Sequence, residues 1–229
     1  MRRILFAFPI VCLGLIGVCA QPNRTVRSTP PAAKPVAAGA LADRGRVIGR
    51  TYTNNTFRFE VTFPDEWLIP GNDFEDYMKK QGFDVSLKAP ANLSPAAKAA
   101  VTAAIKRLQI VMTAYSSMPG TPGQAVVRVA FESLAANPQI KDGVDYCDAI
   151  RSTYGALRLP AGSQVSETQA EKLGKMQFAF LDSTSGGSKM RTYVTVRNGY
   201  AILFRIDYKD DADLQVLRKV LSDGNFDLK

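Results

Sequence analysis

The sequence predicts an α+β fold, an antiparallel β-sheet with helices packed on its faces, and two observations carry this prediction. The first is strict alternation between Phe57 and Phe63, where phenylalanine or valine occupies every second position, as in a half-buried strand. The second is the Asn198-Gly199 pair between two apolar runs, a strong signal for a β-hairpin. Further strands alternate with segments of helical period, an order typical of an α+β domain.

The predicted elements begin and end at turn and cap residues. In the N-terminal half they are strands over residues 51–53, 57–63, 83–88 and 110–115 and helices over 73–81 and 95–108. Pro64 lacks the N–H that would continue the second strand, and Trp67 then folds back onto the sheet as a core residue. Gly82 is a C-cap for the first helix, and Ser94 before Pro95 is an N-cap for the second. The apolar face of that second helix consists of Ala97, Val101, Ala104, Ile105 and Leu108.

The C-terminal half continues the same pattern. It holds a strand over 125–134, a helix from Asp142, strands over 165–172, 175–181, 189–196 and 200–208, and a last helix after Asp210. The apolar run that follows Tyr200 places that strand at the centre of the sheet. The helix from Asp142 is expected to bury Val144, Cys147, Ile150 and Tyr154, and the last helix Leu214, Leu217, Val220 and Leu221. Gly224 ends the last helix, and Phe226 docks a short terminal strand.

The first 20 residues have the layout of a secretory signal peptide. Arg2 and Arg3 precede an apolar run over residues 4–18, and a small-residue cleavage site ends at Ala20. The run is short for a bilayer span and Pro9 interrupts it, so a retained membrane anchor is the weaker alternative. A lipoprotein processed at Cys19 is a further, disfavoured alternative. We therefore expect an exported protein, periplasmic or extracellular.

Residues 21–48 are rich in proline and alanine and have no apolar period, which predicts a disordered linker before a single domain over residues 49–229. Of the formal net charge of +8, residues 1–50 carry +7, with eight basic residues and Asp43. The domain is therefore nearly neutral, and we expect no nucleic-acid partner. The basic linker leaves open a weak contact with an anionic surface.

The chain has no histidine, which excludes Ser-His-Asp and Cys-His catalysis and imidazole metal ligands. Cys147 is the one cysteine outside the leader, and we expect it to be buried; a reactive thiol is the alternative, which Asp145 and Asp148 disfavour because acidic neighbours raise a thiol pKa. Gly174-Lys175 lacks the other residues of a phosphate-binding loop. We predict no catalytic, cofactor-binding or metal-binding residues, and no cofactor.

Three further patterns have simpler structural interpretations. Residues 183–189 carry hydroxyls and a lysine, but their glycine pair indicates a hairpin tip. The acidic residues from Asp207 to Asp213 fit a helix N-cap better than a calcium loop. Asn23 and Asn54 lie in glycosylation sequons, which matter only in a host that glycosylates.

Two stretches resemble a known family. YTNNTFRFEVTFPDEW (52–67) resembles the opening of PsbP/Mog1-like domains, and NGYAILFRIDYKDDADLQVLRKVLSDGNFD (198–227) resembles their end. Residues 73–108 look like an elaboration between them. The resemblance implies an α/β/α sandwich on an antiparallel sheet and mostly non-catalytic work, namely docking to protein partners or accessory roles. The matching positions are structural, so no functional residues carry over.

The sequence thus predicts an exported, non-enzymatic binding or accessory domain that docks a protein partner in the cell envelope or outside the cell. The alternative is a small hydrolase or ligand-binding enzyme that uses carboxylates at the strand end, such as Glu60, Asp65 or Glu66. Clustering of these acids in a concave pocket would favour the enzyme. The partner-binding residues and the oligomeric state do not follow from the sequence.

Overall fold

A seven-stranded antiparallel sheet forms the centre of the domain, with strand order β4-β5-β10-β9-β8-β6 and β7 paired to β8. The computed structural model describes residues 42–71, 74–82, 84–89, 93–156, 159, 161–185 and 187–228. The elements are β1 (Arg46–Ile48), β2 (Thr51–Asn54), β3 (Phe59–Thr62), α1 (Phe74–Lys80), α2 (Pro95–Arg107), β4 (Gln109–Tyr115), β5 (Val126–Ser133), α3 (Gly143–Ala156), β6 (Gln164–Val165), β7 (Gln169–Leu173), β8 (Met176–Ser185), β9 (Ser188–Arg197), β10 (Tyr200–Tyr208) and α4 (Asp211–Asp223).

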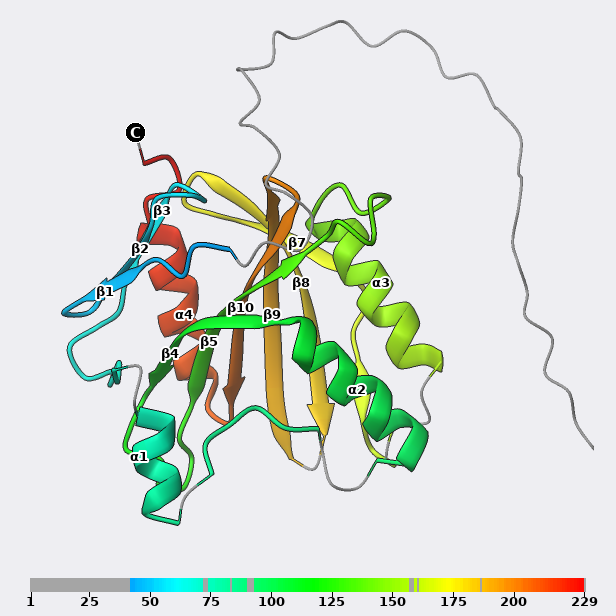
Figure 1. Cartoon of the computed structure of the whole chain (residues 1–229), viewed down its shortest axis with the longest axis horizontal. Coiled ribbons are helices and arrows are strands. Elements are labelled where there is room, and N and C mark those ends of the chain that lie inside the picture. Colours follow the sequence, from blue (N-terminus) through cyan, green and yellow to red (C-terminus); the bar gives the residue numbers. More distant parts are fainter. Residues whose placement is uncertain are drawn as a thin grey trace, which may run out of the picture. The chain divides into compact units, whose positions relative to one another are not determined.

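Helices cover both faces of this sheet (Figure 1). On one face α4 and the three-stranded sheet β1-β2-β3 pack into a shared core, and on the other face lie α3 and α2. The predicted fold class, an antiparallel sheet with helices on its faces, is confirmed. Because the large sheet separates two layers, each strand presents alternate residues to two different environments.

The strand β10 is the central strand, as its apolar run predicted. It pairs with β5 on one side and β9 on the other. The turn before it uses Asn198 and Gly199 at positive φ values of 51° and 75°, the backbone that a two-residue hairpin turn requires. Its first five residues are all buried.

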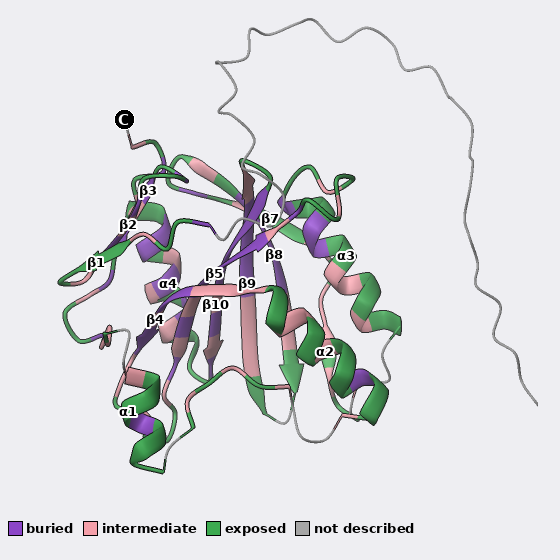
Figure 2. Cartoon of the chain, viewed as in Figure 1, coloured by how far each residue is buried: buried purple, intermediate pink, exposed green. Residues whose placement is uncertain are grey.

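The α4 face of the sheet is filled with aromatic rings. Phe57, Phe59, Val61 and Phe63 are buried there as predicted, and so is Trp67. The strand itself is shorter than the predicted 57–63, because residues 55–58 form a turn with Arg58 at a φ of 54°, and β3 begins at Phe59. Phe59 packs edge-on to Phe204 and stacks on Phe226, with ring centroids 5.6 and 5.7 Å apart. The inner face of α4, formed by Leu214, Leu217, Val220 and Leu221, closes this core. The large aromatic residues therefore build an interior on this side (Figure 2).

Four further expectations about the elements need correction. Of the strand predicted over 83–88, the described residues 84–88 form none and pair with no strand. The segment 165–172 is not continuous; it divides into β6 and β7, which pair with different parts of β8. Val144 is 41% exposed, because Tyr146 and Cys147 face the sheet from that end of α3.

The fourth correction concerns the start of the domain, which lies before residue 49. Ala42 is buried, and its backbone N–H and C=O both bond to the Gln109 side chain, at 3.0 and 2.8 Å. β1 then pairs with β2. Residues 42–48, expected in the linker, are thus part of the domain. The predicted signal peptide, the rest of the linker and Asn23 lie outside the described residues.

Candidate functional site

A cavity of about 690 Å³ lies between α2, α3 and the sheet face opposite α4. We call it the α2–α3 cavity. Apolar side chains make much of its lining: from α2 Val101, Ala104 and Ile105, from α3 Ile150, and from the sheet Leu181 and Leu203. Its volume lies in the range of cavities that hold small organic ligands.

The cavity lies on the face of the sheet opposite the aromatic core. In β10, Tyr200, Ile202, Phe204, Ile206 and Tyr208 point into the α4 core. Ala201 and Leu203 point to the other face, and of these two Leu203 lines the cavity. The N-terminal end of α3 packs directly on this face, since a Cβ on Gly143 would lie 2.5 Å from the Val194 carbonyl oxygen. The hollow lies beyond that contact, over Leu181, Thr192 and Leu203.

The helix α2 forms the roof of the cavity. Its apolar residues share one face as their spacing predicted, but among them only Ala97 is buried, and Val101, Ala104, Ile105 and Leu108 are intermediate. Figure 2 shows that most of α2 is exposed or intermediate. An apolar helix face normally rests on core atoms. Here it faces a hollow instead.

A buried polar cluster joins the roof to the walls. Glu132 of β5 is 7% exposed and accepts hydrogen bonds at both carboxylate oxygens. Tyr146 of α3 donates to Oε2 at 2.5 Å, and Nε of Arg107, the last residue of α2, donates to Oε1 at 2.8 Å. Burial raises the pKa of Tyr146, and the negative charge of Glu132 raises it further. The tyrosine therefore stays a neutral donor, and the cluster is internally satisfied.

Sequence reasoning missed this cluster, although a signal was present. Along β5, Arg128, Ala130 and Glu132 alternate with the apolar residues of the α4 core, and Leu134 just after the strand continues the pattern. A glutamate between alanine and leucine on an inward face needs a partner, since an unpaired buried carboxylate is strongly unfavourable. The partners come from two helices distant in sequence, which no local pattern could name.

The other charged residues of the lining are also paired. Arg205 binds Asp207 through Nη2 at 2.7 Å, and Lys189 binds Asp211 at 2.8 Å. Lys88 pairs with Asp84. Arg128, which is 12% exposed, also binds Asp207, at 2.9 Å. Burial lowers the pKa of Arg128, and Asp207 opposes this effect.

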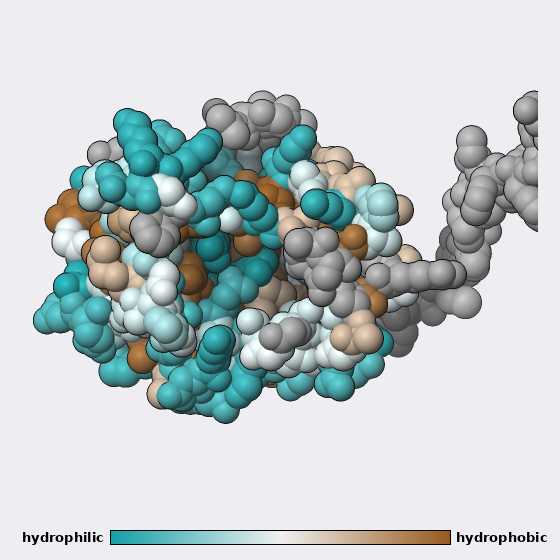
Figure 3. Space-filling model, turned by 90° about the horizontal axis from the view of Figure 1, so that it is seen from below, coloured by the Kyte–Doolittle hydropathy of each residue, from teal (hydrophilic) through white to brown (hydrophobic). Residues whose placement is uncertain are grey.

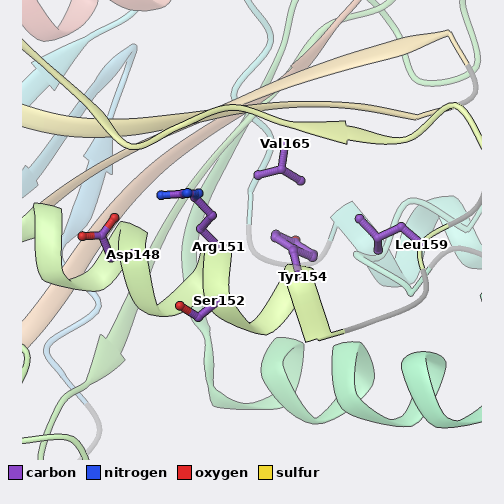
Figure 4. A pocket seen from close by; sticks show the side chains of 7 residues that line it. Asp148, Arg151, Ser152, Tyr154, Leu159 and Val165 are labelled. Carbon is purple, nitrogen blue, oxygen red and sulfur yellow. The ribbon is translucent and has the colours of Figure 1, made fainter.

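A second cavity, of about 630 Å³, adjoins the first along α3. Tyr154 of α3 lies beneath Val165 of β6, with Leu159 to one side, and Arg151 extends from the same helix on the side nearer Asp148 (Figure 4). Tyr154, Leu159 and Val165 line both cavities. Arg151, which lines this second cavity, forms an ion pair with Glu167 at 2.6 Å. The second cavity is thus an extension of the first past the C-terminal half of α3.

The carboxylates of the enzyme alternative do not form a site. The side chain of Asp65 is fully exposed and pairs with Arg50 at 3.2 Å. Glu60 accepts a hydrogen bond from Thr53 at 2.9 Å, and Glu66 is exposed. None of the three lines either cavity described above.

The remaining candidates are structural. Cys147 is buried, and burial raises its thiol pKa to about 12, with smaller effects from Asp148 and Asp142. Asp210 caps α4, and its carboxylate accepts from the N–H of Ala212 at 2.9 Å. Ser185 and Ser188 face each other at the β8–β9 hairpin. Within the described part of the chain, no group of three or more acidic or cysteine side chains could hold a metal ion.

The exposed apolar residues do not gather into a second candidate surface. In the described ranges they are Val47 and Ile48 on β1, Tyr77 on α1, Met118 in the loop after β4 and Val144 on α3. One side of the domain shows hydrophobic residues as separate patches between hydrophilic ones (Figure 3). No helix of the described residues is long and apolar enough to cross a bilayer.

Comparison with known proteins gives a likeness of fold. No protein-family model matches the chain, and no curated protein resembles it in sequence. The solved structures similar to it include cyanobacterial PsbP (CyanoP) from Synechocystis sp. PCC 6803, at 12% identity and a TM-score of 0.43 over 82% of this chain and 98% of that one. They also include LpqN, involved in cell envelope biogenesis of Mycobacterium tuberculosis, at 13% identity and a TM-score of 0.39 over 84% and 88%.

A Bacteroides thetaiotaomicron protein matches at 7% identity and a TM-score of 0.38, over 77% of this chain and 48% of its own. The PsbP resemblance expected from the sequence is found again among these structures. At such identities and scores, the likeness says nothing about a ligand or a partner.

Proposed function

We propose that this chain is an exported, non-enzymatic binding domain, and that its binding site is the α2–α3 cavity. One observation carries the proposal: an amphipathic helix holds its apolar face over a hollow instead of over a core. Leaving apolar side chains of this size partly unburied forgoes roughly 1 kcal/mol or more each. A ligand with an apolar body would recover that burial.

The chemistry of the lining favours binding over catalysis. A general base needs an oxygen or nitrogen free to take a proton from the substrate. Glu132 is the buried carboxylate of the cavity, and Tyr146 and Arg107 occupy both of its oxygens. The carboxylates expected for a hydrolase, Glu60, Asp65 and Glu66, lie outside it. The enzyme alternative therefore has no support in this geometry.

The proposal also includes two expectations from the sequence, export of the protein and binding to a protein partner. The apolar run and cleavage site before Gln21 support export. A protein partner would have to present an apolar group to the α2–α3 cavity, since no broad apolar patch gathers on the described surface.

The experiment places a large side chain into the cavity from α2, the helix that covers it. Ala104 lines the cavity, whereas its neighbour Ala103 on the same helix is exposed and does not. Binding of the neutral apolar dye Nile red, followed by fluorescence, should weaken at least tenfold in Ala104→Trp and stay unchanged in Ala103→Trp. Equal binding by both variants would show that the dye binds elsewhere and would overturn the proposal. Val101→Trp serves as a second filling variant if Ala104→Trp unfolds.

A further inference from the structure

The ion pairs around the α2–α3 cavity indicate which charge its ligand carries. Each of the four cationic side chains in the lining already has an acidic partner: Arg107 with Glu132, Lys88 with Asp84, Lys189 with Asp211 and Arg205 with Asp207. Arg205 reaches both oxygens of Asp207, with Nε and Nη2 on the same carboxylate. A charged site for a ligand head would instead hold an unmatched charge.

A charged ligand would have to compete with these pairs. An anion entering beside Arg205 must displace Asp207, which also binds Arg128, a side chain only 12% exposed. The displaced carboxylate would then remain partly buried beside the ligand's own negative charge. Breaking this half-buried pair is unfavourable, because it leaves a carboxylate and the nearby Arg128 without their partners. A cation meets the same obstacle at Glu132, since Tyr146 and Arg107 hold both of its oxygens.

One end of the cavity offers neutral polar groups instead. There β6 pairs with the end of β8, and the lining includes Ser163, Gln164, Ser183, Thr184, Ser185 and Ser188. Ser163 and Ser185 lie within hydrogen-bond distance, Oγ to Oγ 3.0 Å. Hydroxyl and amide groups both donate and accept, so they suit an uncharged hydrogen-bonding head. The apolar residues of α2 and the sheet floor lie in the same cavity.

We propose that the α2–α3 cavity takes an electrically neutral amphiphile. Its apolar chain or ring lies between α2 and the sheet residues Leu181 and Leu203, and its hydroxyl or amide head lies at the β6–β8 end. The inference rests on the proposed function, because it names the chemistry of the ligand for that same site.

The test compares three ligands that differ only in the head: decan-1-ol, decanoate and decylammonium, each displacing Nile red from the whole exported protein. Decanol should bind at least tenfold more tightly than either charged analogue. Decanoate or decylammonium binding as tightly as decanol would overturn the preference for a neutral ligand. Failure of all three to displace the dye would also overturn it.

Two variants separate this inference from the proposed function. Ala104→Trp should abolish decanol binding and Ala103→Trp should not; if both bind decanol alike, the site itself is wrong. Asp84→Asn removes the partner of Lys88 at an exposed position, where folding is not at risk. It should strengthen decanoate binding at least threefold and leave decanol unchanged. If the affinity for decanoate does not change, the ion pairs do not determine the preference for a neutral ligand. The cavity would still be the binding site.

Discussion

At the scale of single residues, Nε of Arg218 is buried without a hydrogen-bond partner among the described residues, whereas the buried carboxylate and the hydroxyl beside it are paired. Glu132 shows this arrangement most clearly, because one buried carboxylate connects the end of α2, the strand β5 and the helix α3. An acid in this position is structural when its partners are complete. Its removal should therefore lower the free energy of unfolding.

We expect Glu132→Ala to lower the free energy of unfolding by about 2–3 kcal/mol, since it leaves the buried Tyr146 hydroxyl without its acceptor. Glu60→Ala is the matched control. Glu60 also lies on a strand and accepts from a threonine hydroxyl, but it is partly exposed, so its loss should cost less than about 1 kcal/mol. Urea unfolding of the three proteins measures both values. Equal losses in the two variants would contradict this account of Glu132.

The buried thiol predicts a pH dependence with a definite sign. Burial raises the pKa of Cys147 from 9.0 to about 12. The unfolded chain releases the proton first, so the contribution of Cys147 to stability is complete below pH 9.0 and is lost as the pH rises toward about 12. The expected slope is about 1.4 kcal/mol per pH unit.

The Cys147→Ala variant should therefore lose stability less steeply than the wild type across that interval. Buried tyrosines such as Tyr52 and Tyr193 also have raised pKa values, and they add the same decline to both proteins. Urea unfolding at a series of pH values gives the two slopes. Parallel profiles would mean that the thiol ionises equally in the folded and unfolded chains.

At the scale of elements, turn and cap residues could be predicted from the sequence. Ser94 and Asp210 cap α2 and α4, and Asn198-Gly199 makes the hairpin into β10, because each acts through its own backbone neighbourhood. The break between β6 and β7 could not be predicted, since it depends on which part of β8 each segment pairs with.

The position of α2 over the cavity could not be predicted either. Its apolar spacing predicts a buried face, and the residues across the cavity from it, such as Leu181 and Leu203, lie on strands distant in sequence.

The turns allow a sharp test of close packing between elements. Gly174 and Gly187 both have positive φ, 58° and 80°, in the β7–β8 and β8–β9 turns. A Cβ on Gly174 would lie 2.2 Å from the backbone oxygen of Ser222 near the end of α4, whereas one on Gly187 would meet nothing within 4 Å. Gly187→Ala should cost about 1–2 kcal/mol for the backbone conformation alone. Gly174→Ala should cost clearly more, because α4 must move away from the turn.

Thermal unfolding of the two glycine variants decides this prediction. A larger drop in the melting temperature of Gly174→Ala is expected. If the two variants lose the same stability, α4 does not pack against the β7–β8 turn as closely as the structure shows.

At the scale of the whole molecule, the sheet divides the domain into a filled side and a hollow side. The aromatic residues that the sequence places at alternate positions of β10 and β3 all point into the α4 core. The other face carries alanine, valine and leucine under two helices, with the α2–α3 cavity between them. This division gives the fold its stability on one side and room for a ligand on the other. Aromatic residues at every second position therefore predicted the core. The residues between them face the other side of the sheet, where the cavity lies.

The filled side is closed by the last residues of the chain, which gives a prediction for the whole domain. Phe226 stacks on Phe59 and meets Phe178 edge-on, with ring centroids 5.7 and 5.4 Å apart. The backbones of Glu60 and Asn225 exchange two hydrogen bonds, of 2.7 and 2.9 Å. Phe226→Ala should therefore lower the unfolding free energy by about 3–5 kcal/mol. Phe226→Leu, which keeps most of the volume, should lower it by less than about 1.5 kcal/mol.

Two probes on opposite sides of the sheet show whether this loss reaches the entire domain. Trp67 reports on the α4 core by its fluorescence, and the buried Cys147 reports on the α3 face by its reaction with a thiol reagent. Both faces share the strands β8, β9 and β10, so the structure predicts one cooperative transition, and the two signals should shift together in Phe226→Ala. If the fluorescence shifts and the thiol stays protected, the hollow side can persist while the aromatic core opens, and the sheet does not couple its two faces.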